Sequence, residues 1–210
     1  VKLSKVLIYD KSNQELADSE EIGISFSYLN LFRNLSFTES ITEVLLSKPN
    51  FSLKQNKEGV WNFKDLISPD KSSDEDFYGK VKIVKGKATI TVPEKTIFFD
   101  NINGLVDFIT IKNYDIDLAL TTEESMVTVA GNWGQDNTLK VNINNGKIEN
   151  YTAFIPQNND FKIINGNINN LELTITGSDD DFKVQGMTEF NKVTATYKDY
   201  AINDIAGYLI

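Results

Sequence analysis

The second half of the chain, from Lys80 onward, consists of segments in which apolar and polar side chains alternate. The clearest three segments span residues 114–120, 139–143 and 171–175. A period of two is typical of β-strands that present one apolar face and one solvated face. The abundance of Ile, Val, Thr, Phe and Tyr also favours strands over helices. The pattern therefore predicts an all-β protein.

Polar connections separate the alternating segments. Residues 132–137, 157–160 and 177–181 are rich in Asn, Asp and Gly, which predicts hairpin-like turns. Three Asn-Gly pairs, at Asn103, Asn145 and Asn165, leave two interpretations open. Each is either a type I′ turn or a bulge or bend within a strand.

Helix is expected only in one or two short pieces of the N-terminal part. The first spans residues 27–34, where Tyr28, Leu31 and Phe32 share a face, and the second spans residues 62–67. Residues 68–76 have the composition of a linker, and we interpret them as a mobile loop within one elongated body.

An internal repeat is visible in the second half. The segments 87–92 and 101–106 are echoed by the segments 192–197 and 204–209. Such self-similarity favours a unit that is stacked along an axis so that neighbours share an apolar surface. The alternative is chance reuse of short phrases, which is common in β-proteins.

The amino-acid composition excludes several classes of function. The chain has 210 residues and a net charge of −9, so it lacks the basic surface that would bind nucleic acids or anionic membranes. It contains no His and no Cys, which removes the commonest general base and thiolate chemistry. We predict that it is not an enzyme and that it holds no cofactor. Acidic clusters at residues 20–21, 74–76 and 179–181 are interpreted as solvated turns, not as a metal site.

The N-terminal third carries a family resemblance. Residues 44–53 form a strand pattern around Pro49, and residues 59–67 read Gly-Val-Trp-Asn-Phe-Lys-Asp-Leu-Ile. Together with residues 6–10 and 15–32, these segments resemble the opening domain of AsmA-like and TamB-like envelope proteins. The resemblance implies an elongated, curled, taco-like β-groove of mostly antiparallel strands. It divides the chain into an N-terminal β unit with a short helix, residues 1–70, and repeating groove units continuous with it, residues 71–210.

The resemblance also implies a location. Members of this family lie in the periplasm of the bacterial cell envelope, where they bridge the inner and outer membranes. The chain shows no run of 18 apolar residues and begins with Val1, so we expect a piece of a longer protein. The membrane anchor of the parent protein, and any region that engages an outer-membrane barrel partner, would lie outside it.

The apolar faces of the strands are the candidate site. From the residues alone, these faces either close a two-sheet sandwich or line an open trough. The family resemblance implies the trough, with phospholipid acyl chains as the ligand and lipid transport between the two membranes as the function. The predicted groove residues are Ile90, Val92, Ile116, Leu118, Leu120, Val127, Val129, Leu139, Val141, Ile143, Ile163, Leu173, Ile175 and Val184.

Two other functions remain open at this point. The protein could be a scaffold for outer-membrane protein assembly whose sheet edges pair with client strands. It could instead be an extracellular carbohydrate-binding or adhesin-type domain in which Trp133 stacks on sugars. Trp61 belongs to the family motif, where the resemblance favours a role in plugging the end of the β structure.

Overall fold

The computed structural model contains one continuous β-sheet. It describes residues 1–10, 13–32, 38–63, 77–93, 95–110, 113–122, 124–134, 137–151, 161–178, 181–198 and 200–210. The segment 68–76, the turn at 157–160 and most of the second expected helix lie outside these residues. Within them, all eleven strands belong to the same sheet.

The strands follow one another along the chain. Their bounds are β1 Lys2–Tyr9, β2 Glu15–Phe26, β3 Ile41–Lys54, β4 Gly79–Val92, β5 Lys95–Thr110, β6 Asn113–Thr121, β7 Met126–Trp133, β8 Thr138–Lys147, β9 Phe161–Ser178, β10 Asp181–Tyr197 and β11 Tyr200–Leu209. The short helices are α1 Tyr28–Phe32, η1 Thr38–Ser40 and η2 Ile148–Asn150.

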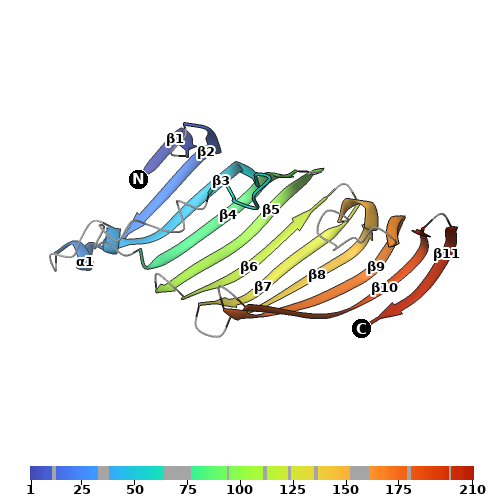
Figure 1. Cartoon of the computed structure of the whole chain (residues 1–210). Helices are drawn as coiled ribbons and strands as arrows, with labels where there is room; N and C mark the ends of the chain where they lie inside the picture. The colour runs from blue at the N-terminus through green and yellow to red at the C-terminus, as the bar shows by residue number, and fades with distance from the viewer. Residues whose placement is uncertain are drawn as a thin grey trace.

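The order of strands in the sheet is the order in the sequence, from β1 to β11. All neighbours are antiparallel except β3 and β4, which are parallel. The sheet is curved and twisted, and the two chain termini lie near its opposite ends (Figure 1). The prediction of an all-β, mostly antiparallel, curled sheet is confirmed, and so is the short helix after Ser27.

The three Asn-Gly pairs lie inside strands. Asn103-Gly104 is in β5, Asn145-Gly146 in β8 and Asn165-Gly166 in β9. The bulge or bend interpretation is therefore correct for all three, and the hairpin-turn interpretation is wrong. The predicted turns at 132–137 and 177–181 do connect strands, β7 to β8 and β9 to β10.

A line of left-handed residues crosses the sheet. One residue in each of seven strands has a φ between 48° and 58°, and we call this line the crease. It consists of Lys5, Lys48, Lys85, Asn101, Asn145, Lys192 and Asp204. An extra residue in the left-handed region makes a β-bulge, which bends its strand. The strands that carry these residues bend there, so the crease runs across the sheet from β1 to β11.

The bend is directed toward the apolar face. In a straight strand, residues three apart point to opposite faces. A Cβ added to Gly86 would lie 3.0 Å from Ile83 Cγ2, and one added to Gly146 would lie 3.2 Å from Ile143 Cγ2. Residues on either side of the bulge thus point into the same corner. Only a small residue fits at Gly86, where Pro49 Cγ is also 3.1 Å away.

The crease divides the sheet into two flanks. The long flank contains residues 2–4, 22–26, 41–47, 79–84, 102–110, 113–121, 126–133, 138–144, 168–178, 181–191 and 205–209. The short flank contains residues 6–9, 15–19, 49–54, 86–92, 95–100, 161–165, 193–197 and 200–203. The face on the inside of the bend is called the inner face, and the opposite one the outer face.

The core lies in the corner of the bend. One buried cluster joins Ile83, Ala88 and Ile102 around the crease in β4 and β5. A second joins Val127 and Ile143 of the long flank to Ile168 and Val193. Strands β6 and β7 stop at the crease, and the buried side chains of Ile148 and Tyr151 pack beside them in this second cluster.

The internal repeat corresponds to the crease. Asn101 and Asp204 align in the repeat, and both have a left-handed backbone. Their preceding strands also correspond, but Lys192 matches Lys85 and not Lys87, because Lys85 and Lys192 are the left-handed residues. The repeated sequence segment therefore corresponds to the part of a strand that crosses the crease.

Candidate functional site

The inner face of the long flank is apolar from one end of the sheet to the other. Direct register partners lie on the same face, so the pairing defines rows of side chains that run across the strands. One row is Ile24, Val44, Val81, Val106, Ile116, Gly131, Leu139, Ile175 and Val184, from β2 to β10. The next is Leu3, Ile22, Leu46, Ile83, Gly104, Leu118, Val129, Val141, Leu173 and Gly186, from β1 to β10.

The outer face of the same flank is polar. Its rows include Lys80, Asp107, Asp115 and Asn132 across β4 to β7. Asn132 Nδ2 donates to Asp115 Oδ1 at 2.8 Å, and Lys80 Nζ lies 3.5 Å from Asp107 Oδ2. A solvated polar face opposite an apolar face shows which side of the sheet needs a cover.

No second sheet supplies that cover among the described residues. The strands make their extensive contacts with their neighbours in the sheet, and β9 also contacts η2. The two edge strands, β1 and β11, do not pair with each other. The sandwich alternative is therefore wrong for this part of the chain, and the apolar face is the inside of an open, bent sheet.

The fourteen predicted groove residues all lie in strands and on the inner face. Ten of them are half-buried: Ile90, Ile116, Leu118, Leu120, Val129, Leu139, Val141, Ile163, Leu173 and Ile175. Val92, Val127 and Ile143 are buried, the last two within the corner cluster. Val184 on β10 is 60% exposed. The structure thus divides the set into buried side chains and side chains that a ligand can reach.

Several inner-face residues escaped the sequence analysis. The N-terminal strands contribute Val44, Leu46 and Phe51 to the same surface, and β5 contributes Phe99 and Val106. In β3 the bulge at Lys48 shifts the alternation, so that Leu46 and Phe51 share a face although they are five residues apart. Recognising Lys48-Pro49 as a bulge would have aligned both halves of the strand.

An aromatic row borders the inner face at the far end of the long flank. Phe108, Tyr114 and Trp133 are register partners on neighbouring strands. The ring centroids of Phe108 and Tyr114 are 5.7 Å apart, and Phe77 packs edge-on against Phe108 at 5.4 Å. Trp133 therefore belongs to an aromatic rim. Trp61 stacks on Phe63 at 5.5 Å, beside the end of β3.

Charges are few on the inner face. Lys95 is the register partner of Val92 there, and desolvation lowers the pKa of its ammonium group, partly offset by the nearby Glu149 carboxylate. The acidic pair Glu20-Glu21 is engaged in ion pairs: Glu20 with Lys48 at 2.7 Å and Glu21 with Lys2 at 2.9 Å. Among the described residues, no group of three acidic side chains is placed to hold a metal ion.

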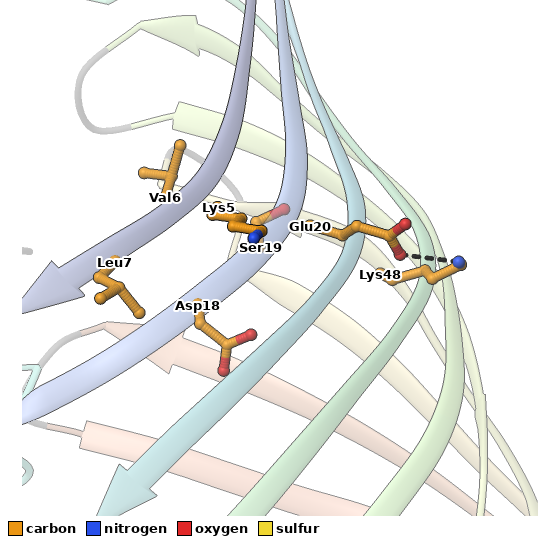
Figure 2. Close-up of a pocket in the computed structure, with 7 residues that line it drawn as sticks. All are labelled: Lys5, Val6, Leu7, Asp18, Ser19, Glu20 and Lys48. Carbon is orange, nitrogen blue, oxygen red and sulfur yellow. Dashed lines mark ion pairs between the residues drawn. The ribbon is translucent and has the colours of Figure 1, made fainter.

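A shallow pocket lies where the crease meets the first edge of the sheet. Its lining comes from β1, β2 and β3 and comprises Lys5, Val6, Leu7, Asp18, Ser19, Glu20 and Lys48. Figure 2 shows the Glu20–Lys48 ion pair on one side of it and Lys5 on the neighbouring strand. The pocket is open, its charged side chains are exposed or half-buried, and the buried Ser19 hydroxyl is already bonded to backbone carbonyls, so it is not a built ligand site. It shows instead how charged side chains line up along the crease.

Comparison with protein-family models, curated proteins and solved structures found no match. In the described part of the chain, no helix has the length and hydropathy needed to span a membrane. The resemblance to the AsmA-like and TamB-like family accordingly stays a prediction that depends on the sequence segments quoted above.

Proposed function

We propose that the inner face binds the acyl chains of phospholipids and shields them during transport between the inner and outer membranes of a bacterial envelope. The observation that carries this proposal is the continuous apolar inner face, which spans the strands from β1 to β10 and has no second sheet over it in the described part of the chain. The family resemblance of the N-terminal third supplies the proposed location, in the periplasm.

The physical requirement for such a function is modest. Moving an acyl chain from a bilayer into water costs about 0.8 kcal/mol per methylene, so roughly fifteen methylenes cost near 12 kcal/mol. Half-buried Leu, Ile and Val side chains can cover the acyl chain and remove most of this cost. A head group can stay in water at the open side, so no specific polar contacts are required.

The geometry suits an extended hydrocarbon better than a compact ligand. The two long rows run across the strands, along the direction in which strands repeat at about 4.8 Å. The long flank offers apolar side chains at each step, interrupted by Gly104, Gly131 and Gly186. A flexible chain can follow such a surface at many positions, which fits a conduit that moves its ligand along.

The test uses a photoreactive amino acid at Val141, in the middle of the second row. Val141 is half-buried on the inner face, and the adjacent Asn142 is on the outer face, opposite Thr128. In cells that make the protein in the envelope, irradiation should give lipid adducts at position 141 and few at position 142. Equal labelling at positions 141 and 142, or no labelling at position 141, would contradict the proposal.

A charge provides the complementary test. Val141→Asp should abolish the phospholipid that copurifies with the chain, as measured by mass spectrometry of organic extracts, because a carboxylate cannot be buried against hydrocarbon. Asn142→Asp is the matched control and should leave the copurified lipid unchanged. Both variants should keep the β circular-dichroism signal. A lipid-free wild-type protein would favour the assembly-scaffold alternative.

A further inference from the structure

The short flank has a gap in the middle of the sheet. Strands β6 and β7 stop at the crease and β8 ends soon after it, whereas β5 and β9 continue across. Among the described strands, residues 95–99 of β5 therefore pair only with β4, and residues 161–165 of β9 pair only with β10. Both strands that border the gap lie inside the sheet, away from its two edges.

Polar groups occupy part of this gap. The turn between β6 and β7 contributes Thr122, whose backbone N–H donates to the Ser125 carbonyl at 2.9 Å. The helix η2 contributes Glu149 and Asn150, and Gly166 N of β9 donates to Glu149 Oε2 at 3.3 Å. An opening of about 150 Å³ remains beside β5, and its lining residues are Lys95, Thr96, Ile97, Phe98, Thr122 and Asn150.

Lys95 lies at the border between this opening and the apolar inner face. Its register partner Val92 is 8% exposed, and Ile97, the next residue on the same face, is 5% exposed. Desolvation in these surroundings lowers the pKa of the Lys95 ammonium group. Lys95 is half-buried and forms no ion pair with a described residue, in contrast to Lys48 and Lys87. A partly dehydrated cation without a counter-charge in contact favours an anionic ligand.

Two uncharged side chains of the opening can donate to the same anion. The Asn150 side chain is half-buried and makes no hydrogen bond to a described residue, so its two N–H groups can donate to a ligand. Thr122 Oγ1 accepts from Ser125 N at 3.0 Å, which leaves its O–H able to donate. The ammonium group and these donors match the oxygens of a phosphodiester, which only accept.

Glu149 decides which kind of phosphodiester fits. Its negative charge acts on Lys95 and partly offsets the lowering of the lysine pKa. The same charge repels a ligand that is only anionic and attracts one that also carries an ammonium group. A carboxylate has about four lone-pair sites, of which the bond from Gly166 N uses one. The opposite charges of Lys95 and Glu149 therefore match a zwitterionic ligand.

The inner face connects the opening to the corner of the bend. Ile97 and Phe99 follow Lys95 on the same face of β5. Phe99 packs against both buried clusters, and so does Leu120 of the long flank. An acyl chain can therefore run from a head group at Lys95 along β5 and onto the apolar surface of the long flank.

We propose that Lys95, Asn150 and Thr122 bind the phosphate of a zwitterionic phospholipid head group whose ammonium group lies toward Glu149. This inference rests on the proposed function of the inner face, because the acyl chains of the same lipid occupy that face. It adds a head-group preference to a surface that needs none in order to shield the acyl chains.

Lipid competition tests the preference. The purified chain is incubated with vesicles that contain equal amounts of phosphatidylethanolamine and phosphatidylglycerol with the same acyl chains, and is then re-isolated. Both lipids are in one vesicle, so the net charge of the protein affects their supply equally. Mass spectrometry of the organic extract measures the total lipid per protein and the ratio of the two head groups. Wild-type protein should carry phosphatidylethanolamine enriched about threefold, as expected for one partly exposed ion pair.

Three variants locate the preference. Lys95→Gln should lose the enrichment and keep the total lipid, because the apolar surface is unchanged. Lys162→Gln is the matched control, since Lys162 is exposed on β9 of the same flank, next to the inner-face residue Ile163 and hence on the outer face. It should change neither quantity. Glu149→Gln keeps an oxygen that can accept from Gly166 N and should also lose the enrichment, because phosphatidylglycerol is no longer repelled.

The outcomes separate this inference from the function on which it rests. Wild-type protein that carries both lipids in the supplied ratio would overturn the head-group site and leave the lipid-binding inner face standing. Equal loss of enrichment in Lys95→Gln and Lys162→Gln would also overturn the site, since net charge would then explain the preference. Protein that carries no lipid at all would overturn both proposals.

A soluble head group distinguishes the lipid from a free phosphodiester. Glycerophosphoethanolamine has the same phosphate and ammonium groups and no acyl chains. Calorimetry with the lipid-free chain should detect no more than weak binding of this compound, because the acyl chains supply most of the affinity. Tight binding that is lost in Lys95→Gln would mean that the opening is a site for a soluble phosphodiester, and would overturn the phospholipid as its ligand.

Discussion

The corner at the crease and the open surface of the long flank are built from the same kinds of side chain and are in different environments. Ile143 in the corner is 6% exposed, whereas Val141, two residues earlier on the same face of β8, is half-buried. The corner gathers side chains from both flanks around one line, and flank residues such as Val129 and Val141 pack only against its margin. The bend therefore provides the core and leaves the inner face of the long flank uncovered.

This division explains how a single sheet can be stable without a second layer. A flat sheet exposes one apolar face completely and gains little from burial. Bending at the crease lets Ile83 and Ile102 pack against Ala88 and lets Val127 pack with Val193. The protein thereby obtains a core from the strip of its apolar face along the crease and leaves the rest of that face open.

The largest expected effect comes from emptying the corner. Ile143→Ala should lower the free energy of unfolding by about 2–5 kcal/mol, the range for truncating a buried Ile. Val141→Ala should cost less than about 1.5 kcal/mol, because a half-buried side chain loses less burial. Urea denaturation of both variants measures the difference. Equal losses at the two positions would break the distinction between corner and flank.

A smaller effect is expected from the backbone at the crease. Lys85 has a φ of 54°, which β-branched residues adopt with difficulty, and its N–H donates to Asn103 Oδ1 at 2.9 Å. Lys85→Val should therefore cost about 1–2 kcal/mol of stability.

Lys82 provides the matched control on the same strand. It is exposed on the outer face of the long flank, where the backbone is extended and Leu105 is its register partner. Lys82→Val removes the same charge and should change the free energy of unfolding by no more than about 0.5 kcal/mol. If both valines cost the same, charge and not the left-handed backbone would explain the effect.

The open flank was largely predictable from the sequence, and the crease was not. Residues 114–120 and 139–143 alternate without interruption, so their strands and their inner faces follow from the period of two. At Lys48, Lys85 and Lys192 the period slips by one residue. Lysine carries no sequence signal for a left-handed backbone, in contrast to Asn145 followed by Gly146.

Open and closed sheets could not be told apart from the residues alone. The same alternating side chains fill a sandwich or line a trough, since the difference lies in what opposes them and not in their identity. The repeat between residues 87–106 and 192–209 did contain the information about the bend. Its meaning became evident only when Asn101 and Asp204 proved to share the left-handed conformation.

The smallest expected effect comes from Lys95, which lies on the inner face of the short flank. It is the one described lysine on that face whose pKa is displaced. Desolvation lowers the pKa of Lys95, so the folded state binds this proton less strongly than the unfolded state does. The penalty is fully present at pH values below the lowered pKa, where both states carry the charge. It diminishes as pH rises toward 10.5, the ordinary value for the group, above which both states are neutral. Lys95→Gln should therefore raise the midpoint of thermal unfolding slightly at pH 7, and the gain over wild type should shrink by pH 10.5. A gain that stays constant over this range would mean that Lys95 acts through packing and not through its partly desolvated charge.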